Sequence, residues 1–309
     1  MTTTGDLGMW GVLIAVLGGA ARVGTPFLFV SLGECLTEKS GRINLGLEGT
    51  LVLGAMSGFG TAYLTGSPWL GVLVAGLTGT ALGWLHAFLC QMPRVNDVAV
   101  GIALMILGTG LAFFFGKPFI HPQAPHLPAF ALGSWSHNPA IQEALRINSL
   151  FVIGALLAPA MWAFFKYSRW GMIVRTVGES ANASLALGFH INRVRMFSTM
   201  GGGFLAGVGG SFLSLYYPGS WSEGLSSGQG LMAVALVIFA RWNPVYCFFT
   251  SLLFGGAAAL GPALQAVGVT RGYYLFNATP YLLTLLIMIF SSSAKRVLAG
   301  MPGQFSGNP

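Results

Sequence analysis

Apolar stretches of about 20 residues recur along almost the whole 309-residue chain, and they decide what it can fold into. A bilayer core of roughly 30 Å needs about 20 apolar residues for each helix that crosses it. The chain offers nine or ten such segments, and the seventh is short enough to be a broken or re-entrant helix. We expect the spans at residues 10–31, 45–65, 69–90, 97–116, 149–166, 196–215, 229–241, 244–262 and 274–291.

Composition fits the same fold class. Charged residues make up 7% of the chain, against roughly 25% in a typical soluble protein, and its 45 glycines suit close approach of helices in lipid. The longest polar stretches are about 30 residues, too short for a core of their own. We therefore predict an all-α polytopic membrane protein in which residues 1–309 form a single transmembrane domain.

We attribute the net charge of +7 to basic residues in the loops on the cytoplasmic side of the membrane. No basic stretch is interleaved with aromatic residues as a nucleic-acid surface would be, so no nucleic-acid partner is expected. Lys and Arg gather in cytoplasmic loops. If 167–195 is a cytoplasmic loop, alternation places the N-terminus outside, the C-terminus in the cytoplasm, and 117–148 in an extracytoplasmic loop. The inner segments then hold Lys39, Arg42, Arg94, Lys166, Arg169, Arg175, Arg193, Arg195, Arg241, Lys295 and Arg296, and the outer ones Lys117, Arg146 and Arg271.

Motifs for chemistry are absent from the sequence. Gly116-Lys117-Pro118 lacks the glycine spacing and the Ser/Thr of a nucleotide-binding loop, and Gly201-x-Gly203-x-x-Ala206 lies inside an apolar span with no preceding strand. The histidines of 117–148 are too irregularly spaced for a metal motif. We expect neither an enzyme nor a cofactor bound by this chain, and we assign the glycines of 198–215 to tight helix packing.

Two polar side chains stand at the start of the second expected span. Asn44 and Glu48 are four residues apart and share one helix face. A carboxylate at that depth is costly unless it is paired or lines a polar cavity. Glu48 is thus either a structural cap or partner at the interface, or part of a solute pathway.

The fourth expected span begins with a similar pair, Asn96 and Asp97. Asn or Asp at the start of a helix is a routine N-cap, which is the simpler interpretation. The alternative is again a polar lining for a solute pathway.

A short helix is expected in the basic loop. Gly178 and Gly188 bracket a run of small and apolar residues, with Glu179 near the helix N-terminus. Such a helix fits a groove on a partner protein. It could instead lie on the membrane interface.

Four blocks, in order, resemble permease subunits of ABC transporters for branched-chain amino acids, ribose and nucleosides. The resemblance is strongest to nucleoside or simple-sugar permeases that work with a basic-membrane-protein type binding lipoprotein, and it covers about residues 26–291. The blocks are SGRINLGLEG (40–49), GESANASLALG (178–188), WSEGLSSGQGLMAVALVIFARWNP (221–244) and PYLLTLL (280–286).

The resemblance implies a type II importer fold in a bacterial cytoplasmic (inner) membrane. A second permease, a copy or a paralogue, would complete a central pathway, ATPase subunits would hydrolyse ATP with Mg²⁺, and an extracytoplasmic binding lipoprotein would deliver a nucleoside, nucleobase or sugar-like solute. Alternating access would be driven through a coupling helix at 178–190. Its motif falls on Gly178, Glu179, Ser180, Ala183, Leu187 and Gly188.

The chain departs from the family pattern at two points. Gln229 stands between Gly228 and Gly230 where Arg is usual, and Asp97 stands where Gln is common. Both leave the solute preference open.

We predict that polar groups near span ends and a few aromatic walls line the pathway. The residues are Asn44, Glu48, Asn96, Asp97, Phe204, Trp221 and Asn277. The main alternative is an ion-driven secondary transporter, which would need buried carboxylates near mid-membrane and two related halves. A structural or scaffold membrane protein is the third.

Overall fold

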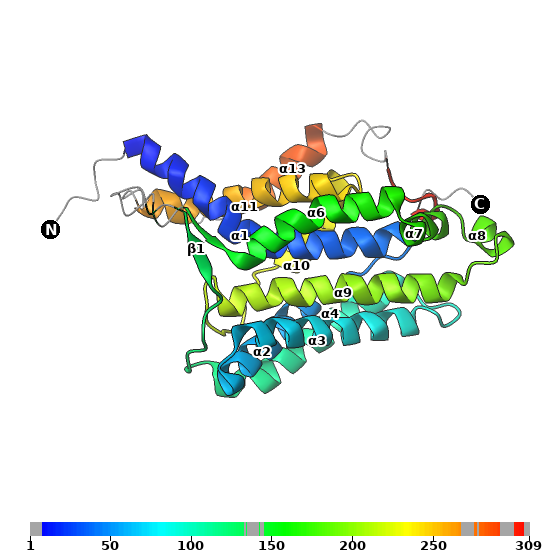
Figure 1. The fold of residues 1–309 in the computed structure, drawn as a ribbon, viewed down its shortest axis with the longest axis horizontal. Coiled ribbons are helices and arrows are strands. Elements are labelled where there is room, and N and C mark those ends of the chain that lie inside the picture. Colours follow the sequence, from blue (N-terminus) through cyan, green and yellow to red (C-terminus); the bar gives the residue numbers. More distant parts are fainter. Residues whose placement is uncertain are drawn as a thin grey trace.

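The computed structural model describes residues 8–132, 134, 142, 145–266, 275–276, 278–290 and 300–305 (Figure 1). Every expected span coincides with a helix in the described part of the chain. The helices are α1 Gly8–Lys39, α2 Leu47–Thr65, α3 Pro68–Leu89, α4 Asp97–Gly116, α6 Ser149–Tyr167, α7 Arg169–Glu179, α8 Ala181–Ala186, α9 Ile191–Leu215, α10 Gln229–Phe239, α11 Pro244–Ala266 and α13 Thr279–Phe290, with 3₁₀ turns η1 Lys117–Phe119 and η2 Gly303–Phe305.

Five helices of the described residues are long and apolar enough to cross a membrane. They cover Val16–Lys39, Pro68–Leu89, Asp97–Phe119, Ser149–Tyr167 and Pro244–Gln265. Helices α2 and α9 are not among these five, and both are rich in Gly, Ser and Thr. Helix α10 is apolar but only 11 residues long. The helical polytopic fold is therefore confirmed, whereas nine crossings remain a prediction.

The first helix differs from its expected bounds, because α1 continues past residue 31 to Lys39. The added turns carry Glu34 and Glu38. Both carboxylates are buried inside the protein. The expected end at residue 31 was wrong, because an apolar run gives no information about which polar side chains neighbouring helices will cover.

Glycines allow the central helices to touch backbone to backbone. α9 lies between α1 on one side and α2 and α3 on the other (Figure 1). A Cβ at Gly79 of α3 would lie 2.0 Å from the carbonyl oxygen of Gly203, and a Cβ at Gly207 would lie 2.1 Å from that of Ala75. The expected close packing of 198–215 is confirmed.

The connection between α4 and α6 contains two short paired strands. Strands β1 Ala129–Ala131 and β2 Arg146–Asn148 pair antiparallel, with Phe130 opposite Ile147. The amide of Leu127 donates to the carbonyl of Leu215 at 3.0 Å, which ties this connection to the end of α9.

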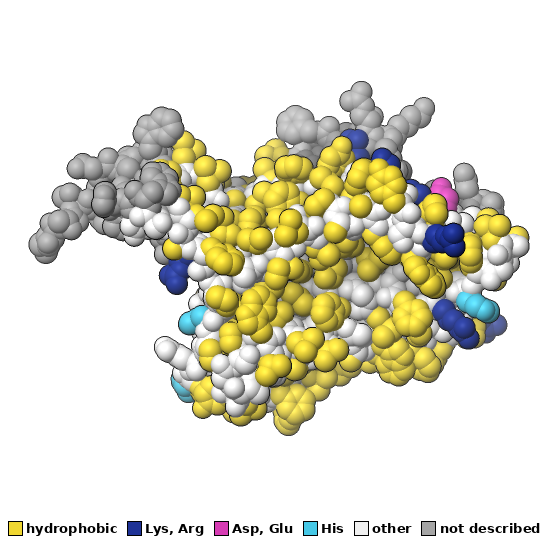
Figure 2. All heavy atoms as spheres, in the orientation of Figure 1, with side chains coloured by type: hydrophobic (Ala, Val, Ile, Leu, Met, Phe, Trp, Pro, Cys, Tyr) yellow, Lys and Arg dark blue, Asp and Glu magenta, His cyan; other side chains and the backbone are white. Residues whose placement is uncertain are grey.

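The opposite end of the bundle carries most of the basic side chains on the face in Figure 2, while apolar side chains cover its middle. This end holds α7 and α8 (Figure 1). Lys166 lies 4.7 Å from the ring centre of Trp162, a cation–π contact typical of a membrane interface.

Candidate solute site and partner-facing segment

A pocket of about 530 Å³ lies between α2, α4 and the loop 224–228. Its walls are mainly apolar, with one carboxylate and three hydroxyl groups among them. The lining residues are Glu48, Val52, Met105, Ile106, Thr109, Gly110, Phe113, Gly224, Ser226, Ser227 and Gly228. Apolar walls with a few placed polar groups are the usual form of a small-molecule site.

Glu48 lines the pocket and caps α10. Its carboxylate accepts hydrogen bonds from the Ser226 hydroxyl, from the Gly228 amide at 3.1 Å and from the Gly230 amide at 2.6 Å. The N-cap residue Gly228 has φ of 80° and no side chain of its own to satisfy these amides. A carboxylate there is stabilised by the positive end of the helix dipole. Glu48 is therefore a structural cap and a pocket residue at once.

Gln229 is the first residue of α10, directly after this cap. Its Oε1 atom is buried and has no hydrogen-bond partner in the part of the chain that the structure describes. This buried amide oxygen is therefore an unsatisfied polar atom among the residues described.

Asn44 lies outside this pocket and organises the link between α1 and α2. Its backbone amide donates to Glu34 at 2.8 Å, and its side-chain oxygen accepts from the Gly46 amide at 2.9 Å. Glu38, one turn further along α1, accepts from the indole of Trp242. Sequence reasoning missed both glutamates, although their i, i+4 spacing and the lack of a breaker before Gly41 were signals of a continuing helix.

The pair at the start of α4 is also structural. The Asn96 side chain accepts from the amides of Val98 and Ala99 and so caps the helix. Asp97 forms an ion pair with Arg42, which also donates to the Cys90 carbonyl at 2.6 Å. Thr109 of the pocket lies roughly 18 Å further along α4 at 1.5 Å per residue, so these groups are remote from it.

The aromatic candidates are packing residues in the described structure. Phe204 contacts α3 at Gly76, where an added Cβ would lie 2.4 Å from its ring. Trp221 is only 1% exposed and packs on Gly116. Asn277 lies outside the described residues. Of the seven predicted pathway residues, Glu48 is the one described residue that lines this pocket. Thr109, Ser226 and Ser227 were missed; the hydroxyl inside Gly108-Thr109-Gly110 was the available signal.

The predicted partner-facing segment begins later than expected. Gly178 belongs to α7, where it packs against α1: a Cβ there would lie 2.1 Å from the Lys39 carbonyl oxygen. Glu179 is the last residue of α7 and accepts from the Gly303 amide at 3.3 Å. Gly178 therefore does not bracket the short helix, because its missing side chain serves helix packing.

The short helix itself is α8. Ser180 caps it by accepting from the Ala183 amide at 3.2 Å, and Gly188 follows it with φ of +80°, as expected of a glycine that ends a helix. Leu185 and Leu187 are 61% and 64% exposed. Both leucines therefore lie on the surface at this end of the bundle.

Comparisons with known proteins agree with this architecture. Residues 10–292 match the family described as branched-chain amino acid transport system, permease component. A putative glucose ABC transporter permease of Haloferax volcanii is 35% identical over 259 residues, which are 82% of this chain and 79% of the relative.

Two further relatives cover most of both chains. A nucleoside ABC transporter permease of Lactococcus lactis is 29% identical over 85% of this chain and 88% of its own length. A guanosine ABC transporter permease of Bacillus subtilis is 26% identical over 90% and 92%. No solved structure matches the chain. The chain belongs to the permease-component family of ABC transporters, as a non-catalytic, multi-pass membrane subunit whose ATP is hydrolysed by a partner.

Proposed function

We propose that the chain forms half of the pathway of an ATP-driven importer for a nucleoside, nucleobase or sugar-like solute. The pocket between α2, α4 and 224–228 carries this proposal. Its apolar walls suit the face of a base or sugar ring, while Glu48, Thr109 and the two serines offer groups for ring hydroxyl or amino substituents. The names of the relatives, which include glucose, nucleoside and guanosine permeases, support the same solute class.

A second permease, a copy or a paralogue, would complete this pathway. The pocket is bounded on one side by α4, whose Ile106 and Phe114 are 66% and 67% exposed. If the second subunit packed against this exposed face of α4, it would close the open side of the pocket.

The partner ATPase would dock on α8, at the end of the bundle where Lys166, Arg169 and Arg193 lie. Basic residues favour the cytoplasmic side, so the N-terminus and the 117–148 connection would lie outside. The binding lipoprotein would meet that outer end, in a bacterial cytoplasmic membrane. A push on α8 would reach α1 through α7, because Gly178 and Glu179 pack at the end of α1 and on residue 303.

Co-purification from native membranes tests the proposal. The tagged chain should retain an ATPase subunit with a nucleotide-binding loop, detected by mass spectrometry. Gly188→Val should lose most of it, since Gly188 ends α8 at φ of +80°. Gly66→Val is the matched control: Gly66 also has positive φ and open space around it, but it ends α2 at the other end of the bundle.

The reconstituted complex distinguishes the remaining classes. ATP-dependent uptake of labelled guanosine or glucose is expected. Uptake by the chain alone, driven by an ion gradient without ATP, would instead establish the secondary transporter. Equal loss of the ATPase from Gly66→Val and Gly188→Val would remove the role proposed for α8.

A further inference from the structure

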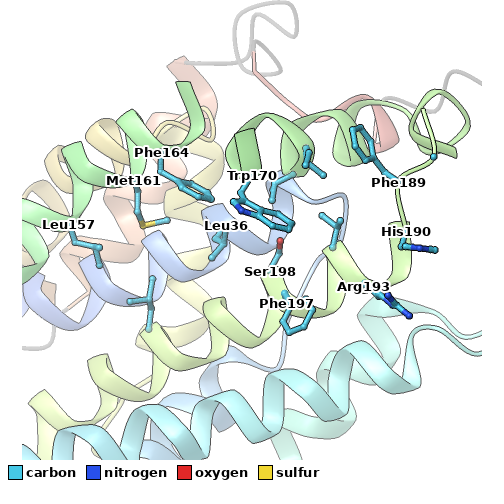
Figure 3. A pocket seen from close by; sticks show the side chains of 15 residues that line it. Leu36, Leu157, Met161, Phe164, Trp170, Phe189, His190, Arg193, Phe197 and Ser198 are labelled. Atoms are coloured by element: carbon cyan, nitrogen blue, oxygen red, sulfur yellow. The ribbon is translucent and has the colours of Figure 1, made fainter. Parts of the chain in front are cut away.

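A second, larger cavity lies on another face of the protein. It is a groove of about 840 Å³ between α6 and α9, both of which pack on α1. Figure 3 shows Leu157, Met161 and Phe164 of α6 on one wall, Phe197 and Ser198 of α9 on the other, and Leu36 of α1 between them. The proposed solute pathway uses none of these residues.

The groove has the length of one lipid leaflet. On α9 it runs from Arg193 to Leu205, which is roughly 18 Å at 1.5 Å per residue. Half of a bilayer core of about 30 Å is close to this length. Apart from Ser198, the side chains along that depth are aliphatic, aromatic or sulfur-containing.

The groove is amphipathic along its length. Arg193 and His190 lie together at the end next to α8 (Figure 3), and both are exposed. No acidic side chain is among the lining residues that the structure describes. The mouth therefore offers a positive group where the walls change from apolar to polar, which is complementary to an anionic headgroup.

Aromatic residues place this mouth at the level of lipid headgroups. Trp170, which also lines the groove, is 70% exposed, and Tyr167 is 67% exposed. Lys166 contacts the rings of both Trp162 and Tyr167 at 4.7 and 5.2 Å. Belts of Trp and Tyr with basic neighbours are typical of the membrane interface.

We propose that this groove binds one anionic phospholipid, with an acyl chain between α6 and α9 and the phosphate at Arg193 and His190. The lipid would act as a structural wedge, since it would fill the space that α6 and α9 leave between them. Anionic lipids of the surrounding leaflet are the source, and a basic pocket between membrane helices is a recognised form of such a site.

Native mass spectrometry of the delipidated full chain tests the site. Phosphatidylglycerol is titrated against phosphatidylcholine with the same acyl chains. One phosphatidylglycerol should be retained, and Arg193→Ala should weaken its binding about five-fold, the effect of one basic group near the headgroup. Arg169→Ala is the matched control, because Arg169 is an exposed arginine at the same end that does not line the groove.

Blocking the apolar part gives an independent test. Leu205→Trp and Leu157→Trp fill the inner end from opposite walls and should reduce retention of both lipids. A monodisperse peak in size-exclusion chromatography shows that these two tryptophan variants are folded. If they misfold, the comparison of Arg193→Ala with Arg169→Ala tests the lipid site instead.

Three outcomes would overturn the proposal. The first is unchanged phosphatidylglycerol retention in folded blocking variants, and the second is an equal effect of the two arginine substitutions. The third is a lipid-free dimer that Leu157→Trp dissociates, because it would assign the groove to a second copy of the chain.

Discussion

Replacing Glu48 by alanine removes the acceptor of three hydrogen bonds at the start of α10. Two donors are backbone amides and one is the Ser226 hydroxyl. A hydrogen bond to a charged group contributes about 1.5–3 kcal/mol. Because Glu48 borders the pocket and water can reach part of the vacated space, we expect a loss near the lower limit for three such bonds, about 4–5 kcal/mol in total.

Thermal unfolding in detergent measures this loss. The free cysteines Cys35, Cys90 and Cys247 are all buried, so a thiol-reactive fluorophore reports unfolding. With the scaling known for the largest soluble domains, Glu48→Ala should lower Tm by roughly 8–20 °C. Glu48→Gln, which keeps the shape but cannot accept from donors at both oxygen positions, should lose about half as much.

Glu223→Ala is the matched control for this experiment. Glu223 belongs to the same connection but is exposed and has no hydrogen bond described, so its removal should change stability by less than about 0.5 kcal/mol. If Glu48→Ala unfolds at the same temperature as Glu223→Ala, the carboxylate does not cap α10 and the geometry drawn for the pocket is wrong.

Three further substitutions test other contacts by the same assay. Gly79→Ala should destabilise by at least about 1–3 kcal/mol, since its Cβ would meet the Gly203 carbonyl, whereas Gly110→Ala, with open space around it, should be neutral or slightly stabilising; equal effects would contradict the close helix contact. Asp97→Asn should cost about 1–2 kcal/mol by leaving Arg42 without its ion pair, and a double-mutant cycle that shows no coupling would refute this. Gln229→Met should stabilise the isolated chain by up to about 1 kcal/mol by removing a buried amide oxygen that lacks a partner, and a lowered Tm would show that the amide is satisfied.

The local features of this fold could be predicted from the sequence. Apolar runs located the helices, the position of Asn96 before an apolar run indicated its N-cap, and Gly203-x-x-x-Gly207 indicated close packing. Each of these depends on residues within a few positions of one another, where helix geometry alone fixes what can be neighbours.

The features that could not be predicted depend on contacts between residues far apart in the sequence. Glu48 meets Ser226 across 178 positions and Trp242 meets Glu38 across 204, and no local pattern specifies such pairs. The same limit explains Gly178, which looked like a helix boundary but serves contact with α1. The first span was expected to end at residue 31, whereas α1 continues to Lys39 and its Glu38 is buried against Trp242, far away in the chain.

The glycine contact between α3 and α9 restricts how this subunit can move. Where two backbones are in direct contact, no side-chain rotamer change can adjust their spacing. We therefore expect α3 and α9 to move together as one rigid body. A conformational change between two states would therefore need backbone rotation in another segment. Residues 219–228 are one candidate, because Gly219, Gly224 and Gly228 all have positive φ. Both the rigid body and this segment contact α2, because α3 and α9 pack against it and the Gly228 amide donates to its Glu48.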